Sequence, residues 1–405
     1  MSVISRFLRY VTYHTTSDDG SQAVPSTPGQ LELARLLVQE LQELGLSDAM
    51  MDQFGRVYAH LPATQGYEDK PVLGLIAHMD TAPDVSGQNV KPSLVEYTGG
   101  DILLNEELGI RMGREEFPCL ERYEGKTLIV TDGTTLLGAD NKAGVAEIMA
   151  TVEWLVNHPE VPHVALAVAF TCDEEIGRGA DHFDYERFGA TYAYTIDGGT
   201  LGEVEYENFN AAEARLSIQG RNIHPGSAKN IMKNAILMAT QFVSMLPEAE
   251  SPAHTEGYEG FFHVHHFQAN EEHAEVRVII RDHDRAKFES RKAFLRQTVE
   301  YLNQVHGEDR FTLSIQDSYY NMKEMILPHM ELIHRAEAAF AANGVQPIIR
   351  PIRGGTDGAR LSWEGLPCPN LSTGAENFHG IHEFACVEDM EQMVRMLVHL
   401  VEWRD

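Results

Sequence analysis

Residues 164–177 read VALAVAFTCDEEIG. The apolar run 164–171 ends in three consecutive acids, Asp173, Glu174 and Glu175. A short apolar run of this kind is typical of a strand that is buried on both faces of a parallel sheet. Ionised carboxylates at its end repel one another and are costly to bury. These acids therefore need a compensating charge, and open α/β sheets bind their ligands at the carboxyl ends of strands.

The pattern around this stretch alternates between strands and helices. This order predicts an α/β domain with a mostly parallel sheet and helices on both faces. We expect strands at 72–77, 127–131, 164–171 and 192–196, and helices at 30–46 and 141–157.

The pattern changes after residue 208. Residues 209–320 predict the order β-α-β-β-α-β, which is the split βαβ unit with two helices on one face of a small sheet. We interpret this part as an inserted α+β lid domain. Residues 1–208 and 321–405 then form one discontinuous catalytic domain, whose last part adds helices at 330–343 and 387–403 and a short strand near Ile348. Within the insertion we expect strands at 211–220, 261–268, 274–280 and 310–316, and helices at 232–246 and 284–305.

The composition excludes several classes of partner. Acidic residues outnumber basic ones by 61 to 32 in 405 residues, a formal net charge of −29. Nucleic acids and anionic membranes require local positive charge, so neither is expected. The four cysteines are far apart, and the N-terminus has neither a cleavage signal nor a long apolar core. We therefore expect a cytoplasmic protein without a disulfide framework or a membrane span.

Polar side chains follow directly after four of the predicted strands. A single acid at a strand end is often only a turn residue. Four strand ends that carry histidine or carboxylates toward one edge of the sheet favour a binding site instead. The residues are His78 and Asp80, Asp140, the acids 173–175, and Asp197.

One imidazole among several carboxylates suits zinc or a similar divalent ion. In His78-Met-Asp80, side chains two residues apart on a strand point the same way, so Asp80 can orient His78. A carboxylate can also bridge two cations about 3.5–4 Å apart. A second imidazole is available in the late segment NFHGIHE, but spacing does not separate His379 from His382.

Seven motifs together resemble the peptidase T family of bacterial cytoplasmic aminotripeptidases, in the dizinc aminoacylase/carboxypeptidase superfamily. They occur in order over essentially the whole chain, and the segments EVEYENFN and SYYNM also resemble this branch. The motifs are HMDTAPD (78–84), LLGADNKAG (136–144), FTCDEEIGRGA (170–180), TIDGG (195–199), NIHPGSAKN (222–230), PIRGGTDG (351–358) and NFHGIHEF (377–384).

This resemblance implies a zinc-dependent aminopeptidase that releases the N-terminal residue of tripeptides. Two zinc ions per subunit, with cobalt or manganese as substitutes, would lower the pKa of a shared water. Glu174 would be the general base, Asp80 would orient His78, and the Asp140–Asn141 peptide bond would be cis. The metal ligands implied are His78 and Asp197 for one ion, Glu175 and His379 for the other, and Asp140 as the bridge.

The resemblance also implies residues that bind the small peptide substrate. His224 would donate to the oxyanion, although a histidine before Pro-Gly is also a common turn residue. Arg281 and Arg353 could clamp the substrate carboxylate bidentately, and Arg281 could alternatively form a salt bridge with a neighbouring acid. The protein would be a monomer or a homodimer. Two departures, Asn141 and Cys172, stand where relatives often have aspartate and proline, and they suggest a shifted metal preference.

Three other functions are weighed against this one. Another amidohydrolase of the same superfamily, such as a dipeptidase, carboxypeptidase or acylase, would use the same metal residues. A non-catalytic zinc-binding protein would not need a general base, so the glutamate at position 174 argues against that function. A nucleotide-binding protein is disfavoured, because IGRGAD lacks the full phosphate-binding spacing and follows acids that would repel phosphate.

Overall fold

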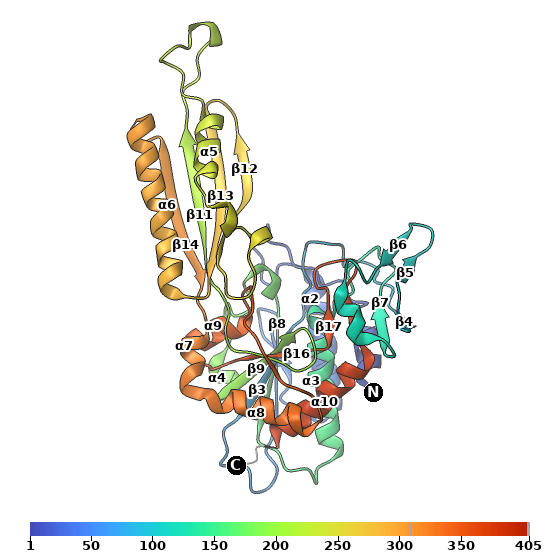
Figure 1. Cartoon of the computed structure of the whole chain (residues 1–405). Helices are drawn as coiled ribbons and strands as arrows, with labels where there is room; N and C mark the ends of the chain where they lie inside the picture. Colours follow the sequence, from blue (N-terminus) through green and yellow to red (C-terminus); the bar gives the residue numbers. More distant parts are fainter. Residues whose placement is uncertain (308, 403–405) are drawn as a thin grey trace. The chain divides into compact units, whose positions relative to one another are not determined.

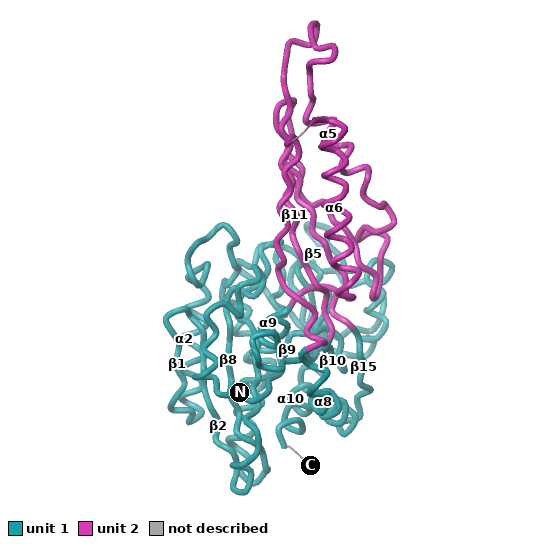
Figure 2. Tube along the Cα trace, turned by 90° about the vertical axis from the view of Figure 1, so that its left-hand side faces the viewer, with its two compact units in different colours: residues 1–206, 325–350, 356–405 teal, residues 207–324, 351–355 magenta. Residues whose placement is uncertain are grey.

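The computed structural model describes residues 1–307 and 309–402 (Figure 1). The chain forms two compact units (Figure 2). Unit 1 comprises Met1–Tyr206, Met325–Arg350 and Thr356–Asp405, and unit 2 comprises Glu207–Glu324 and Pro351–Gly355. The short stretch Pro351–Gly355 differs from the expected boundary. It joins unit 2 because the N–H of Ile352 donates to the carbonyl of Glu207 at 2.8 Å.

The central sheet of unit 1 has eight strands in the order β1-β2-β8-β3-β9-β16-β10-β15. Its middle strands β8, β3, β9 and β16 are parallel, and antiparallel pairs flank them. The mostly parallel α/β sheet is therefore confirmed. The strands are β1 (Met50–Met51), β2 (Val57–Leu61), β3 (Leu73–His78), β8 (Leu166–Thr171), β9 (Tyr192–Gly198), β10 (Glu203–Glu205), β15 (Ile348–Ile349) and β16 (Asn370–Ser372).

One expected strand of this sheet lies elsewhere. β7 (Thr127–Val130) belongs to a separate antiparallel sheet with the order β17-β18-β7-β4. The sequence expectation that β7 ends at the edge of the main sheet is wrong. The other strands of that sheet are too short, and too distant along the chain, for a sequence pattern to show them. They are β4 (Ser93–Glu96), β17 (Ala375–Glu376) and β18 (Phe384–Cys386). A hairpin of β5 (Ile102–Asn105) and β6 (Ile110–Met112) stands beside them.

Helix α3 (Ala139–Asn157) is the most buried helix of unit 1, and the candidate site residue Asp140 lies at its start. It packs against β3, β9, α1 and α10. Gly144 permits the close approach to β9, because a Cβ there would lie 1.9 Å from the carbonyl oxygen of Ile196. The other α-helices of unit 1 are α1 (Val3–Tyr10), α2 (Pro28–Glu43), α4 (Tyr185–Phe188), α8 (Met330–Ala342), α9 (Asp357–Trp363) and α10 (Val387–Val401).

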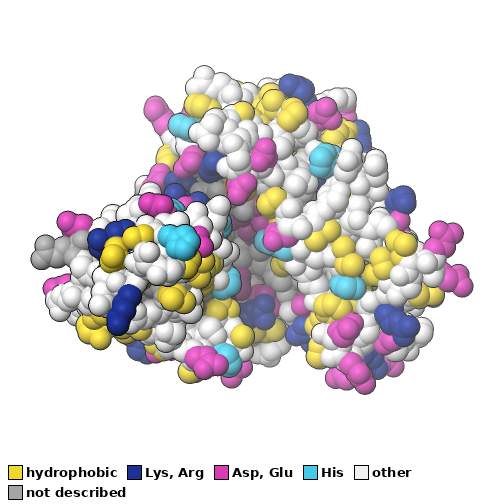
Figure 3. All heavy atoms as spheres, turned by 90° about the horizontal axis from the view of Figure 1, so that it is seen from above, with side chains coloured by type: hydrophobic (Ala, Val, Ile, Leu, Met, Phe, Trp, Pro, Cys, Tyr) yellow, Lys and Arg dark blue, Asp and Glu magenta, His cyan; other side chains and the backbone are white. Residues whose placement is uncertain are grey.

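Helix boundaries differ from the expected ones by a few residues. The last helix, expected over 387–403, ends at Val401, and Trp403 lies outside the described residues. Within the described residues, every helix is too short or too polar to cross a membrane. Acidic and basic side chains are interspersed over the face drawn in Figure 3.

Unit 2 is an antiparallel sheet in the order β12-β13-β11-β14 with two helices on one face (Figure 1). The chain order β-α-β-β-α-β is confirmed. Alternate residues of the strands point into a core that includes Leu216, Phe242, Val276 and Phe288. The first helix begins later than expected because the Asn234 side chain caps it. The elements are β11 (Asn210–Gln219), α5 (Ala235–Ser244), β12 (Phe261–Ala269), β13 (His273–Asp282), α6 (Arg285–His306) and β14 (Phe311–Tyr319), followed by α7 (Lys323–Ile326).

Candidate metal centre

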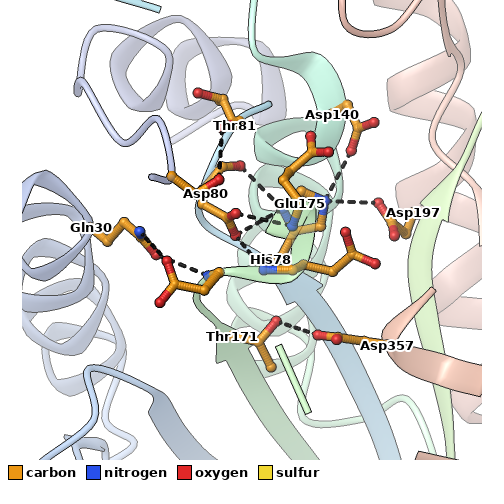
Figure 4. Close-up of polar contacts among 12 residues, drawn as sticks. Gln30, His78, Asp80, Thr81, Asp140, Thr171, Glu175, Asp197 and Asp357 are labelled. Carbon is orange, nitrogen blue, oxygen red and sulfur yellow. Dashed lines mark hydrogen bonds and ion pairs between the residues drawn. The ribbon is translucent and has the colours of Figure 1, made fainter. Parts of the chain in front are cut away.

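Five side chains from separate segments of unit 1 meet at the carboxyl edge of the central sheet. Figure 4 labels His78, Asp140, Glu175 and Asp197 among them. His78 is the last residue of β3, and Asp197 lies near the end of β9. Glu175 lies in the short 3₁₀ turn that follows β8. Asp140 is at the start of α3, and His379 lies between β17 and β18. Three adjacent parallel strands, β8, β3 and β9, thus place three of the five.

The carboxylate of Asp140 lies between two imidazoles. Its Oδ1 is 2.9 Å from Nε2 of His78, and its Oδ2 is 3.3 Å from Nε2 of His379. Each imidazole nitrogen has a second carboxylate beside it. Nε2 of His78 is 3.3 Å from Oδ1 of Asp197, and Nε2 of His379 is 3.0 Å from Oε2 of Glu175. The cluster therefore consists of two imidazole–carboxylate halves that share Asp140.

The donor set fits divalent cations. One ligand atom each of His78, Asp140 and Glu175 lie within 4.8 Å of one another. Oε1 of Glu175 is buried and has no hydrogen-bond partner among the described residues, so it has an unused lone pair at the centre of the cluster. Imidazole nitrogen with carboxylate oxygen is the ligand chemistry of zinc and similar ions. By contrast, His382 contacts the carbonyl of Arg111 at 3.1 Å, so the structure brings His379 and not His382 to the cluster.

The acids perturb one another strongly. Burial and the charge of Asp140 raise the pKa of Glu175 to about 8, and burial raises the pKa of Asp197 to about 7. Hydrogen bonds that His379 donates to the carboxylates of Asp140 and Glu175 raise the pKa of His379 to about 11. For His78, burial opposes the imidazolium, but Asp197 and Asp140 outweigh it and raise the pKa well above its usual value. Without a metal, these side chains therefore hold protons between imidazoles and carboxylates, and a bound cation would take the place of those protons.

Asp80 organises both sides of the cluster. Its backbone carbonyl accepts from Nδ1 of His78 at 3.1 Å, which fixes the orientation of that ring. Its carboxylate accepts the backbone N–H groups of Glu174 at 3.0 Å and of Glu175 at 3.1 Å. Asp80 is fully buried, and these donors satisfy its charge.

Asp173, the first of the three consecutive acids 173–175, fixes the turn that follows β8. Its backbone is left-handed, with φ of 62°. Its buried carboxylate accepts from the backbone N–H and hydroxyl of Ser26 and from the side-chain amide of Gln30. Gln30 in turn accepts the N–H of Asp173 at 3.1 Å. These four bonds hold the turn that carries Glu174 and Glu175 against the start of α2.

Glu174 lies in this turn, and its side chain has no partner in the described part of the chain. Burial and the neighbouring acids Asp357, Asp197 and Glu175 raise the pKa of Glu174 well above its ordinary value. No hydrogen bond or ion pair of its carboxylate occurs among the described residues, whereas its neighbour Glu175 contacts His379. The two consecutive acids therefore have different surroundings.

The three remaining candidates belong to unit 2. His224 is exposed and caps a short 3₁₀ turn, with Nδ1 accepting the N–H of Gly226 at 3.1 Å. Arg281, on β13, donates to the carbonyl of Arg353 at 3.0 Å, and its buried Nε has no partner among the described residues. Arg353 donates to the carbonyls of Thr255, Gly257 and Glu259. Arg281 and Arg353 are thus brought together.

The sequence is similar to proteins of known family over nearly its whole length. It is 53% identical to peptidase T of Halothermothrix orenii over 401 residues, which cover 99% of this chain and 98% of that protein. The chain belongs to the peptidase T family. Residues 206–310 also match the family model described as a peptidase dimerisation domain.

Solved structures share the fold of this peptidase T family member. A tripeptidase of Staphylococcus aureus gives a TM-score of 0.78 at 20% identity, over 99% of this chain and 97% of that one. The YXEP protein of Bacillus subtilis, described as a dinuclear metal binding peptidase of the M20 family, gives 0.67 at 14% identity, over 99% and 96%. The Asp140–Asn141 peptide bond is cis, as the resemblance to the family implies.

Sequence reasoning missed two carboxylates beside the cluster of this peptidase. Asp357, at the start of α9, accepts from the hydroxyl of Thr171 at 2.8 Å. A Cβ at Gly179 would lie 2.1 Å from its carboxylate oxygens, so only glycine leaves room for it. Glu383 accepts three backbone N–H groups around Asp140. Both lie within quoted motifs, but nothing in their local pattern separates them from ordinary turn acids.

Proposed function

We propose that this member of the peptidase T family removes the N-terminal residue from tripeptides at a pair of divalent metal ions. One observation carries the proposal. Asp140 lies between His78 and His379, each of which has a carboxylate of its own beside it. This arrangement offers two ligand sets with a common carboxylate, which is what a bridged pair of ions requires.

The ligand assignment follows from these contacts. His78 and Asp197 would hold one ion, Glu175 and His379 the other, and Asp140 would bridge them. Two zinc ions are the proposed pair, because tetrahedral nitrogen and oxygen sites suit zinc, and cobalt or manganese could replace it. When bound, such ions polarise a substrate carbonyl and lower the pKa of water toward neutrality.

Glu174 is the proposed general base. Its carboxylate is free of ion pairs among the described residues. Its backbone is held by the hydrogen bond that its N–H donates to Asp80 and by the hydrogen bonds around Asp173. It can take a proton from the attacking water and deliver it to the leaving amine. Glu174 is not needed as a ligand in this scheme, so proton transfer is the role left to it.

His224 is proposed as the donor to the oxyanion. Because its Nδ1 accepts from the N–H of Gly226, the proton of the neutral ring lies on Nε2. Nε2–H is then available to a developing negative charge on the substrate. Whether the donor comes from the same chain or from a second copy does not change this assignment of the tautomer.

Of the two arginines, Arg281 is the better candidate for the substrate carboxylate. Arg353 already donates to three backbone carbonyls and to the hydroxyl of Thr255, and its guanidinium lies over the rings of Phe209 and Phe261. Among the described residues Arg281 donates one hydrogen bond, to the carbonyl of Arg353, and its guanidinium lies over the ring of Phe261. We therefore assign the clamp to Arg281, with Arg353 shaping the segment 255–259 beside it.

The decisive experiment compares tri-alanine with di-alanine, tetra-alanine and N-acetyl-alanine. The proposal expects rapid release of free alanine from tri-alanine alone, with two equivalents of zinc in the active protein and loss of turnover after treatment with a chelator. Preference for the dipeptide or the acylated amino acid would indicate another amidohydrolase of the superfamily. Unchanged turnover in the fully metal-free protein would contradict the metal site itself.

A homodimer built through unit 2 is also proposed. The matched family model describes a dimerisation domain, and α6 and β14 leave a groove lined by Arg296, Val299, Glu300, Asn303, Leu313 and Ile315. β14 is an edge strand whose outer side can pair with a second copy. Light scattering on the intact protein and on Leu313→Glu tests this, since the variant should be monomeric. The four free cysteines suit a reducing compartment, and we propose the cytoplasm.

A further inference from the structure

The segment 376–383, which carries His379, has a glutamate at each end. Glu383, at one end, is buried and accepts three backbone N–H groups from the opposite loop. Its Oε2 accepts from Leu137 and Gly138, both at 2.8 Å, and its Oε1 accepts from Asp140 at 2.9 Å. Both oxygens are therefore spent on the loop that carries Asp140.

The glutamate at the other end contacts a different ligand loop. Oε1 of Glu376 accepts from the hydroxyl of Thr200 at 2.8 Å, and Thr200 lies in the loop that follows β9, the strand that carries Asp197. The same oxygen accepts from the hydroxyl of Tyr123 at 2.9 Å and from the guanidinium of Arg122 at 2.6 Å. Glu376 thereby ties the Asp197 loop to the His379 segment.

The Asp140 loop cannot satisfy these N–H groups by itself. Gly138 is the N-cap of α3 with φ of 81°, and it has no side chain that could cap the helix. The first N–H groups of a helix lack partners within the helix, and leaving a buried one unpaired costs about 1–3 kcal/mol. A carboxylate from 243 to 246 residues away supplies the acceptor instead. The position of Asp140 relative to His379 is therefore fixed through Glu383.

We propose that Glu376 and Glu383 are positioning residues that hold the loops of Asp197 and Asp140 against the His379 segment. In this role they set the separation of the ligands before any metal arrives. Glu383 is not itself a metal ligand, because both of its oxygens already accept N–H donors. Glu376 makes its contacts through Oε1, which accepts from one N–H and two O–H donors. The inference rests on the proposed metal site, and it assigns to two further residues the preorganisation of that site.

The test uses the full-length protein and one variant at each end, with a matched control. Glu383→Gln keeps the shape of the side chain but replaces one acceptor oxygen by an amide that cannot accept. Thr200→Val removes the hydroxyl donor and leaves Glu376 intact. Glu388→Gln is the control: Glu388 also accepts a backbone N–H, that of Thr127, but it lies outside the ligand loops.

Two measurements are made on each protein. The first is hydrogen exchange of the amides 137–140 in the metal-free protein. The second is the affinity for Co²⁺, followed by its visible absorption, since that spectrum reports the ligand geometry without any turnover. We expect faster exchange in Glu383→Gln and a dissociation constant raised about 10- to 100-fold, the usual effect of removing a partner that orients a ligand. Thr200→Val should weaken Co²⁺ binding while leaving exchange at 137–140 unchanged, and Glu388→Gln should match the parent.

The outcomes separate this inference from the proposed function. Parent-like Co²⁺ affinity and spectrum in both Glu383→Gln and Thr200→Val would overturn the inference, as would an equal loss of affinity in Glu388→Gln. Failure of the parent itself to bind Co²⁺ would overturn the metal site. In that case slow exchange at 137–140 in the parent and fast exchange in Glu383→Gln would still uphold the loop contact. Near-ultraviolet circular dichroism identifies any variant that has not folded.

Discussion

Oδ1 of Asp80 accepts the backbone N–H of Glu174 at 3.0 Å. The same carboxylate, through Oδ2, accepts the N–H of the next residue, Glu175, at 3.1 Å. The expectation for Asp80 was that it orients His78, and the contact that fixes the His78 ring most closely is to the backbone carbonyl of Asp80. Oδ1 of Asp80 also lies 3.3 Å from Nδ1 of His78. The carboxylate therefore contacts that ring and, in addition, positions the turn on which both the proposed base and a proposed ligand lie.

Asp80→Asn tests this positioning role. The asparagine keeps one oxygen that can accept, but its NH₂ group replaces the other oxygen and faces a backbone N–H. One N–H of the turn therefore loses its acceptor. We expect kcat for tri-alanine, at saturating metal, to fall about 10- to 100-fold. Asp52→Asn is a suitable control, because Asp52 also accepts two backbone N–H groups, from Phe54 and Arg56, away from the cluster. Equal losses in the two variants would contradict a specific role for Asp80.

Glu174→Gln separates proton transfer from metal binding. The glutamine fills the same space but cannot act as a base, and general acid–base catalysis of this kind contributes about 10²- to 10⁴-fold. We expect kcat to fall by at least about 10²-fold, with unchanged metal content by atomic absorption. Near-normal turnover in this variant would show that another group carries the proton.

Glu175→Ala should have the opposite signature. Glu175 contacts His379 and carries the unpartnered Oε1, so its removal deletes a proposed ligand. We expect the variant to lose about one equivalent of metal, and activity to return in part when excess metal is added. Full metal content with an unchanged Co²⁺ spectrum would remove Glu175 from the ligand set.

Local patterns were enough to select the candidate ligands that follow buried strands. His78, Glu175 and Asp197 each come directly after an apolar run whose strand lies in the main sheet, so the sheet itself brings them together. Asp140 was found through a strand that turned out to lie in another sheet, and it reaches the cluster because α3 packs against β3 and β9. The structure thus brings Asp140 to the cluster, although the strand placement behind its prediction was wrong.

Residues that contact the loops of the candidate ligands could not be found in this way. Glu383 acts on residues more than 240 positions earlier in the chain, and Gln30 acts on Asp173 across 143 positions. No periodicity marks such contacts, because each is made once and between loops. The choice of His379 over His382 likewise depends on backbone geometry, since His379 has a φ of 63° that sequence spacing does not reveal.

The two arginines of unit 2 give a prediction about the substrate carboxylate. Arg281→Ala should raise KM for tri-alanine about 10- to 100-fold, because an ionic hydrogen bond to a charged group is lost. The same variant should have little effect on tri-alanine amide, which lacks that charge. Arg353→Ala should raise KM for both substrates alike, since it removes the hydrogen bonds that hold the segment 255–259. Equal effects of Arg281→Ala on the acid and the amide would exclude the clamp.

Glu147 gives a prediction about stability rather than activity. It is fully buried in α3, and neither carboxylate oxygen has a partner among the described residues. Burial, together with the nearby charge of Asp389, raises the pKa of Glu147 well above its usual value. Asp389 is itself paired with Lys126 at 2.6 Å, so that cation is already engaged.

The sign of the pH dependence follows from linkage. Between the ordinary pKa of about 4.3 in the unfolded chain and the raised pKa of the folded protein, the folded state holds the extra proton. Stability is therefore lost as the pH rises through that range. Glu147→Gln cannot titrate, so its urea midpoint should fall less than that of the parent between pH 5 and pH 8, each measured without metal.

Glu153→Gln is the matched control on the same helix. Burial opposes its ionisation, but hydrogen bonds from the N-terminal ammonium and Arg6 outweigh this and lower the pKa of Glu153. The stability that Glu153 contributes is therefore present above its unfolded pKa and is lost as the pH falls. Glu153→Gln should lower the urea midpoint at pH 7, whereas Glu147→Gln should raise it. Parallel pH curves for the parent and Glu147→Gln would show that the buried carboxyl finds a partner, such as internal water, that holds its charge.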